Sequence, residues 1–446
     1  MTYNVGMVSL GCDKNRVDAE IMLSILSKEG YSIVTDPKTA DVIIVNTCGF
    51  IESAKEESIN TILEMAQNKE EGKCKSVIVT GCMAQRYKDE LMSEMPEIDA
   101  VVGTGTYRQI AEIVKQTLNG EKGIISTDEI NYNLDYEKRI LSTPSHYAYV
   151  KIAEGCNNNC SYCIIPRLRG RFRSREMDNI IQEVKDIVSQ GVKEIILVAQ
   201  DTTKYGVDLY GEKTLPKLLK ELEKIEDLKW IRVMYSYPED VTDELIDAVA
   251  ESEKVCHYFD IPMQHISNNI LTAMKRTTSK EEILGLINRI KTKMPDAVIR
   301  TSLIVGFPGE TEEDFNELKD FIKLNLLDRV GIFTYSPEEG TLAAKLDNQI
   351  EENLKESRKN ILMQLQSMNS LENNKKLVNK VLKVLVEGKG KNNQYYGRSY
   401  QDAPDIDQNI YINSDINLKT GDIVNVKIKE AYTYDLIGDV YHESCK

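Results

Sequence analysis

Apolar and polar positions alternate in two different rhythms along the first 120 residues. Short apolar runs end near residues 10, 47 and 81, and amphipathic stretches with helical spacing cover 18–31 and 54–67. Strands that alternate with helices in this way form open parallel sheets. The pattern therefore predicts an α/β domain over residues 1–120.

A second α/β region is expected over residues 146–374. The stretch 121–145 is polar and lacks core-forming periodicity, so it is predicted to be a linker. Beyond it, apolar runs and amphipathic stretches alternate again through about Leu346, followed by a charged helix near 350–374. Several strand-helix units in a row predict a full or partial TIM-type barrel, whose chemistry lies at the C-terminal strand ends.

The last segment, 375–446, has a different pattern. Short runs of alternating polarity, such as KVLKVLVEG and DIVNVKIKEAY, are broken by Gly, Asn and Asp. This pattern predicts a small antiparallel β-barrel or sandwich.

Composition narrows the function classes. The chain has 446 residues and a net charge of -15, which argues against a polyanion as its main partner and favours a basic protein. Neither an apolar run long enough to span a bilayer nor a signal peptide is evident, so a cytoplasmic location is expected.

Three cysteines form the strongest local motif. Cys156, Cys160 and Cys163 have C-x3-C-x2-C spacing in a Gly- and Asn-rich turn after an apolar strand. Three thiolates can bind three irons of a 4Fe-4S cluster and leave the fourth open, here for S-adenosylmethionine. The alternative, a zinc site completed by His146, fits the spacing poorly because zinc sites usually pair C-x2-C units.

Three further cysteines predict a second cluster. Cys12, Cys48 and Cys82 each follow an apolar run of the first domain. The C-terminal ends of parallel strands share one edge of a sheet, so these thiols should converge there. Coincidence is the alternative, because buried cysteines are common in α/β cores. The chain's other three cysteines, which show no such pattern and are taken as ordinary thiols, are Cys74, Cys256 and Cys445.

These motifs together resemble the methylthiotransferase family of radical S-adenosylmethionine enzymes across essentially the whole chain. The resemblance rests on SLGCDKNRVDAE, VNTCGFIESAKEESI, GCMAQRY, EGCNNNCSYCIIP, IPMQHIS and a last domain like the TRAM domain. The segments LVAQDTTKYGVD and GRSYQDAPDID are similar to the RimO branch, whereas the sister MiaB-like branches modify adenosine in transfer RNA.

The resemblance implies a specific reaction. A RimO-like enzyme methylthiolates the β-carbon of an aspartate in a small-subunit ribosomal protein, the twelfth, with S-adenosylmethionine and two 4Fe-4S clusters, the second supplying or holding the sulfur. Such chemistry implies an electron donor such as flavodoxin or ferredoxin, and the partner is the basic ribosomal protein or the small subunit. Expected cofactor contacts, with loop packing as the alternative, are Tyr162, Gln264, Arg300 and Gly306.

Charge in the last domain bears on the substrate. From Val381 to Lys446 there are 8 Lys and Arg against 10 Asp and Glu, which makes transfer RNA an unfavourable partner. The acidic run Asp402, Asp405 and Asp407 is either a docking surface or a solvated loop. Transfer-RNA methylthiotransferase remains the alternative activity, and a non-catalytic iron-sulfur carrier or redox sensor is the alternative from another class.

The first of two smaller features of the sequence is open to two interpretations. The arginines at alternate positions from Arg167 to Arg175 form a basic stripe, either a site for a carboxylate or a solvated face. Asp13 and Gln408 depart from the family pattern, which usually has Pro and Gly there. They place in doubt only the geometry of the adjacent turns.

Overall fold

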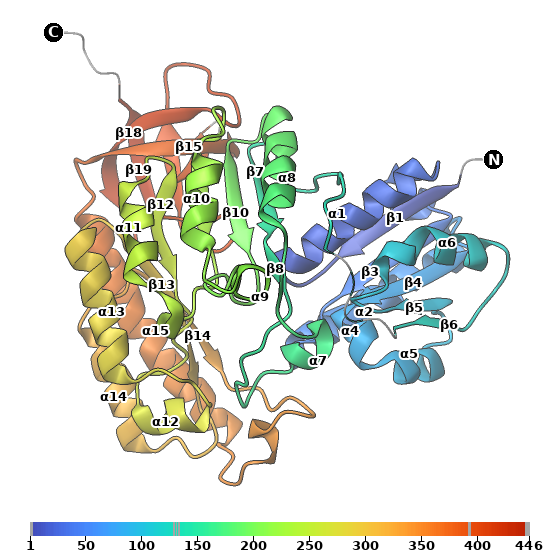
Figure 1. Ribbon diagram of the computed structural model, residues 1–446, viewed down its shortest axis with the longest axis horizontal. Helices are drawn as coiled ribbons and strands as arrows, with labels where there is room; N and C mark the ends of the chain where they lie inside the picture. The colour runs from blue at the N-terminus through green and yellow to red at the C-terminus, as the bar shows by residue number, and fades with distance from the viewer. Residues whose placement is uncertain (1–2, 128–129, 131, 133, 391–393, 442–446) are drawn as a thin grey trace.

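The computed structural model describes residues 3–127, 130, 132, 134–390 and 394–441 (Figure 1). Three modules are evident: an N-terminal domain in blue, a central domain in green to orange, and a C-terminal barrel in red that lies against the central domain. Cys445 lies outside the described residues. None of the helices that the structure describes combines the length and apolar composition needed to cross a bilayer.

The N-terminal domain is a six-stranded parallel sheet in the order β2-β1-β3-β4-β5-β6, with helices on both faces. Its strands are β1 (Asn4–Ser9), β2 (Ser32–Val34), β3 (Val42–Thr47), β4 (Ser76–Gly81), β5 (Ala100–Val102) and β6 (Ile124–Ser126). Its helices are α1 (Asp13–Lys28), α2 (Glu52–Ala66), α3 (Asn68–Glu71), α4 (Cys82–Arg86), α5 (Lys88–Glu94) and α6 (Ile110–Leu118). The predicted open parallel sheet is confirmed.

The predicted linker segment is partly built into both neighbouring domains. Strand β6 pairs in parallel with β5, so the first sheet extends into this segment. Further along, the buried guanidinium of Arg139 pairs with Glu20 of α1 and lies 2.8 Å from Glu183 of the central domain. Arg139 is a fixed bridge between the two domains because burial of its charge depends on both carboxylates.

The central domain contains an open parallel sheet in the order β14-β13-β12-β11-β10-β7, with an alternation of strands and helices like that of a partial barrel. Its strands are β7 (Tyr147–Lys151), β10 (Glu194–Val198), β11 (Trp230–Val233), β12 (Val255–Asp260), β13 (Val298–Val305) and β14 (Arg329–Thr334). Its helices are α7 (Ile165–Arg169), α8 (Met177–Ser189), α9 (Val207–Tyr210), α10 (Leu215–Glu223), α11 (Asp243–Glu251), α12 (Asn268–Ala273), α13 (Lys280–Lys293), α14 (Glu312–Lys323) and α15 (Glu352–Lys375).

Two short antiparallel strands hold the cysteine loop close to the C-terminal end of β7. Strands β8 (Ala153–Glu154) and β9 (Arg173–Ser174) pair on either side of the loop and of α7. A side chain at Gly155 is excluded, because its Cβ would lie 2.2 Å from the carbonyl oxygen of Arg171. The two arms of the loop thus approach as closely as backbone allows, which fixes where the loop leaves the sheet.

The C-terminal module is a closed barrel in the order β15-β16-β17-β19-β18. Its strands are β15 (Val381–Lys389), β16 (Tyr395–Ser399), β17 (Asn409–Asn413), β18 (Ile423–Ala431) and β19 (Asp435–Val440). Neighbours are antiparallel except β17 and β19, which run parallel. Closure removes free sheet edges, so the small domain is a barrel rather than a sandwich.

The acidic run of the last domain contacts the central domain. Asp402 is 2% exposed and accepts hydrogen bonds from Arg329, with an Oδ1 to Nη2 distance of 2.8 Å. Asp407 accepts from the hydroxyl of Tyr258 on β12 at 2.6 Å, and Asp405 accepts from the hydroxyl of Tyr147 on β7 at 3.0 Å. Both interpretations, docking surface and solvated loop, are therefore wrong for Asp402 and Asp407, whose side chains are buried against partners in the central domain. Asp405 is exposed, and for this residue both interpretations stay open.

The pairing of Asp402 with Arg329 provides a test of this interface. Removing one member of a buried pair leaves an uncompensated charge, which costs about 3–5 kcal/mol. We expect D402A to lower the free energy of unfolding in urea by about this amount. The chain's single tryptophan, Trp230, packs with Leu385 of the last domain, so its fluorescence reports this interface directly.

Two variants control this test. E430A removes an exposed carboxylate of β18 and should change the unfolding free energy by less than about 0.5 kcal/mol. D402A/R329M should recover much of the lost stability, because an apolar side chain tolerates burial without a partner. Equal stability of D402A and E430A would contradict the role given to the pair.

Candidate functional site

The first cysteine set lies on the loop between β8 and α7. Cys156 and Cys160 are buried and Cys163 is half-buried. The Sγ atom of Cys160 lies 4.0 Å from the hydroxyl oxygen of Tyr237 and 3.9 Å from Nη1 of Arg276. A cation and a hydroxyl thus face the middle cysteine.

Burial makes Cys156 and Cys163 poor acids without a metal. The pKa is raised to about 11 for Cys156 and to about 12 for Cys163, mainly by burial, and the charge of Cys160 contributes to both shifts. Backbone N–H groups two residues onward, of Asn158 and Ile165, oppose this by donating to the two sulfurs. Donors aimed at sulfur are typical of iron-sulfur sites, where they tune the reduction potential.

The second cysteine set converges at the C-terminal edge of the first sheet. Cys12 precedes α1, Cys48 follows β3, and Cys82 begins α4 directly after β4. A Cβ at Gly11 would lie 2.8 Å from Cβ of Cys48, so the loops after β1 and β3 are in direct contact. Burial raises the pKa of Cys48 to about 12, and the charges of the other two thiolates add to it.

The donor geometry fits clusters better than single ions. Among the described residues, no three His, Cys, Asp or Glu side chains are grouped so as to hold one metal ion. Each thiolate of a cubane cluster binds a different iron, so a cluster needs wider sulfur spacing than a single ion does. The thiols of the first set share one loop and those of the second lie on neighbouring loops, and of these six cysteines only Cys12 is exposed.

A cavity of about 780 Å³ is lined by residues that follow or neighbour members of both cysteine sets in the sequence. One wall is the loop of the N-terminal domain that begins with Phe50, two residues after Cys48, and the opposite wall includes Tyr162, next to Cys163. The floor is made by the ends of β13 and β14 and the segment after them. The cavity thus adjoins both sets, at the C-terminal strand ends where barrel chemistry is expected.

Gln264 lines this cavity in a constrained conformation. Its φ angle is 72°, in the left-handed region that few non-glycine residues adopt. Its N–H donates to the Ser302 carbonyl at 2.9 Å, and its carbonyl accepts from the N–H of Ile304 at 2.7 Å. Strain that the surroundings hold in place is characteristic of binding sites.

The other two expected cofactor contacts, Arg300 and Gly306, do not line the cavity. Arg300 pairs with Asp260 at 2.7 Å and lines a smaller cavity, of about 240 Å³, beside the C-terminal barrel. The N–H of Gly306 donates to Glu310 at 2.7 Å, and a Cβ there would lie 2.3 Å from Cγ of Lys355. All four cofactor contacts stay predictions, and of the four residues Tyr162 and Gln264 line the cavity.

The basic stripe does not form a single surface. Arg167 and Arg171 are exposed, whereas Arg169 and Arg175 are buried. Arg175 lies 2.5 Å from Glu183 of α8, and Arg169 points into the N-terminal domain. A solvated face is therefore the wrong interpretation for the two buried arginines.

The two departures from the family pattern are accommodated locally. Asp13 accepts from the hydroxyl of Tyr235, which follows β11, at 3.2 Å, and so adds a tie between domains beside Cys12. Gln408 is buried and donates to the hydroxyl of Ser370 on α15 at 3.0 Å. Each polar side chain thus has a structural partner.

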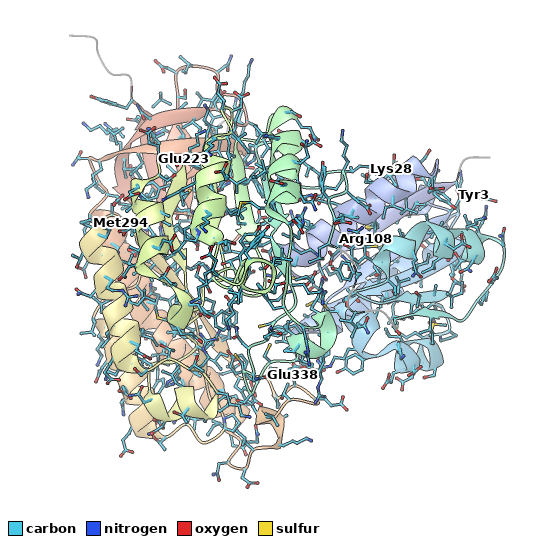
Figure 2. The ribbon with its side chains drawn as sticks, in the orientation of Figure 1. Tyr3, Lys28, Arg108, Glu223, Met294 and Glu338 are labelled. Carbon is cyan, nitrogen blue, oxygen red and sulfur yellow. The ribbon has the colours of Figure 1, made fainter. Side chains whose placement is uncertain are left out.

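One interdomain contact at the cavity had no signal in the sequence. Glu338, at the lower junction of the two halves in Figure 2, accepts from Arg86 of α4 at 2.8 Å and lies 3.3 Å from Lys55 of α2. Arg86 falls within the GCMAQRY motif, but nothing local indicates a partner 252 residues away. The pair holds the N-terminal domain against the cavity wall.

Comparison with known families assigns each module. Residues 4–103 match the family described as Uncharacterized protein family UPF0004, residues 150–322 match the Radical SAM superfamily, and residues 378–440 match the TRAM domain. The Kitasatospora setae methyltransferase TsrM, a radical S-adenosylmethionine enzyme, shares the fold with a TM-score of 0.58, at 14% identity over 77% of this chain and 74% of that one. The chain is thus a radical S-adenosylmethionine protein, a class that uses a 4Fe-4S cluster.

Full-length relatives define the family. The ribosomal protein uS12 methylthiotransferase RimO of Clostridioides difficile (strain 630) is 52% identical over 440 residues, covering 98% of this chain and 99% of that protein. The protein of the same name from Clostridium perfringens (strain 13 / Type A) is 53% identical over 445 residues, covering 100% and 99%. The chain belongs to this RimO family, and it is a radical S-adenosylmethionine methylthiotransferase.

The close approach of loops around the second cysteine set gives a test. A Cβ at Gly49 would lie 2.8 Å from Cα and 2.9 Å from N of Met83, so G49A must displace the backbone beside Cys48 or Cys82. We expect G49A to bind about half of the wild-type iron after anaerobic reconstitution, measured by colorimetric iron assay.

Gly285 supplies the matched control. It lies within α13, and a Cβ there meets no atom within 4 Å. G285A should keep its full iron content and gain about 0.5–1 kcal/mol of stability, since alanine is the better helix former. Full iron binding by G49A would show that the loop spacing does not matter for the second set.

Proposed function

We propose that this chain methylthiolates the β-carbon of an aspartate in ribosomal protein uS12. The relatives over its full length carry that protein in their names. The observation that carries the proposal is the cavity lined by residues that follow or neighbour members of both cysteine sets, since both parts of the reaction need access to one substrate carbon.

Each cysteine set is assigned to one cluster. Cys156, Cys160 and Cys163 would hold the cluster that binds S-adenosylmethionine, and a second 4Fe-4S cluster would be held by Cys12, Cys48 and Cys82. When bound, these groups supply a radical able to take hydrogen from an unactivated carbon, and a place for sulfur. The protein's own contribution is to hold the two sets on separate domains with a substrate cavity between them.

The cavity wall suits radical chemistry. Aromatic and aliphatic side chains contribute much of the lining, including Phe50, Ile304 and Phe333. Once a substrate covers them, such side chains would exclude water and limit side reactions of a reactive intermediate. Tyr162 and Gln264 are the side chains that we assign to the cofactor, because they lie on the wall beside the first set.

The partners follow from the same reaction. A chain with a net charge of -15 attracts a Lys- and Arg-rich ribosomal protein, free or within the small subunit, more readily than transfer RNA. One-electron reduction of the first cluster requires a donor such as flavodoxin or ferredoxin. An enzyme that modifies a ribosomal protein acts in the cytoplasm.

Single cysteine variants separate the two halves of the reaction. C160A should abolish production of 5'-deoxyadenosine and hence all product. C48A should still cleave S-adenosylmethionine but add no methylthio group. Chromatography of the nucleoside and mass spectrometry of uS12 measure the two steps independently in the reconstituted, reduced enzyme.

A buried thiol outside both sets provides the control. Cys74 packs in the core beneath the first sheet, and C74A should retain both activities. Transfer RNA is offered in a parallel reaction. Methylthio transfer to RNA alone would assign the sister activity, and wild-type transfer by C48A would refute the role of the second set.

A further inference from the structure

The helix that follows the first cysteine set contacts the second. Helix α7 begins two residues after Cys163 and lies at the junction of the two halves (Figure 1). Ile164 and Leu168 pack against Cys82, and the hydroxyl of Thr104 donates to the Leu168 carbonyl at 2.6 Å. One short segment therefore connects the two sites physically.

Arg169, the last residue of α7, extends this contact into the N-terminal domain. Its side chain is 2% exposed, and Nη1 lies 2.6 Å from Oδ2 of Asp18 on α1. Nη2 donates to the amide oxygen of Asn15, and that same oxygen lies 3.8 Å from Sγ of Cys82. The guanidinium and the thiol thus share one neighbour in a buried space.

The surrounding charges keep Arg169 cationic. Burial lowers its pKa, yet the charges of Cys82, Glu154 and Asp18 raise it well above the ordinary value. Lys151 lies 2.5 Å from Asp18 and 2.6 Å from Glu154, so two cations share two carboxylates.

We propose that Arg169 is a positioning residue for the second cluster, holding the Cys82 thiolate and stabilising the reduced cluster. The inference rests on the proposed function in one respect, since it requires that cluster to exist. Reduction adds one electron to a site already carrying thiolate charge, and a buried cation favours the added charge more strongly than an exposed one. Arg169 should therefore raise the reduction potential.

The experiment uses full-length protein in which the first cluster is removed by C156A/C160A/C163A. The second cluster is then the sole source of the electron paramagnetic resonance signal, and dithionite titration gives its midpoint potential. We expect R169Q to lower the equilibrium constant for one-electron reduction at least tenfold, equivalent to about 59 mV. R169K, which keeps the charge, should recover most of this loss.

Two further variants separate charge from general damage. R175Q removes an equally buried arginine of the same stripe, one that pairs with Glu183, and should leave the potential unchanged. E154Q removes a carboxylate 3.2 Å from Arg169 and should raise the potential. Shifts of opposite sign would not follow from loosened packing.

Each outcome has a distinct meaning. Absence of iron from the C156A/C160A/C163A parent would refute the second cluster and this inference with it. Normal iron with equal potentials in R169Q and the parent would refute the role of Arg169 and leave the proposed function intact. Loss of iron from R169Q but not R175Q would support the positioning role, and equal loss from both would contradict it.

Discussion

Buried ion pairs between basic side chains and carboxylates fix the positions of the three domains relative to one another. Arg139 joins both α/β domains, Lys151 and Arg169 are paired at the same interface, and Arg329 joins the central domain to the last one. A buried ion pair is weak evidence for stability, because desolvation offsets most of its attraction. A buried ion pair instead restricts geometry. The two domains can take only those relative positions in which each buried charge keeps its partner.

This constraint matters because the cysteine sets lie on different domains. Apolar contact is non-directional, so two domains joined by it alone can slide without losing much free energy. A guanidinium fixes direction as well as distance through its planar donors. The pair of Arg86 with Glu338 lies at the cavity, and Arg169 lies in the interface between the two α/β domains, so small shifts between these domains are resisted at both places.

The sequence predicted those parts of the structure that depend on residues close together in the chain. Periodicity predicted the parallel sheets. Cysteine spacing predicted the first thiol set, and the position of Cys12, Cys48 and Cys82 after apolar runs predicted the second. The partners of Asp402 and Arg169 were not predictable, since Arg329 and Asp18 lie 73 and 151 residues away. In a helix as short as α7, periodicity cannot tell exposed Arg167 from buried Arg169. The parallel pairing of β17 with β19 was missed for the same reason, because register between non-adjacent strands leaves no local trace.

The burial of acidic residues also changes how charge bears on the substrate. Among the acidic residues of the last domain, Glu387, Asp402, Asp405 and Asp407 have side-chain partners in the central domain. Acidity of the barrel's surface is therefore a weaker argument against RNA than the composition suggests. Exposed carboxylates do occur at the cavity, where Glu52 and Glu352 have side chains 68% and 66% exposed, although each pairs with a lysine of its own helix. Electrostatic selection for a basic substrate consequently acts at the cavity and over the chain as a whole, and the TRAM domain contributes to it less than its sequence implies.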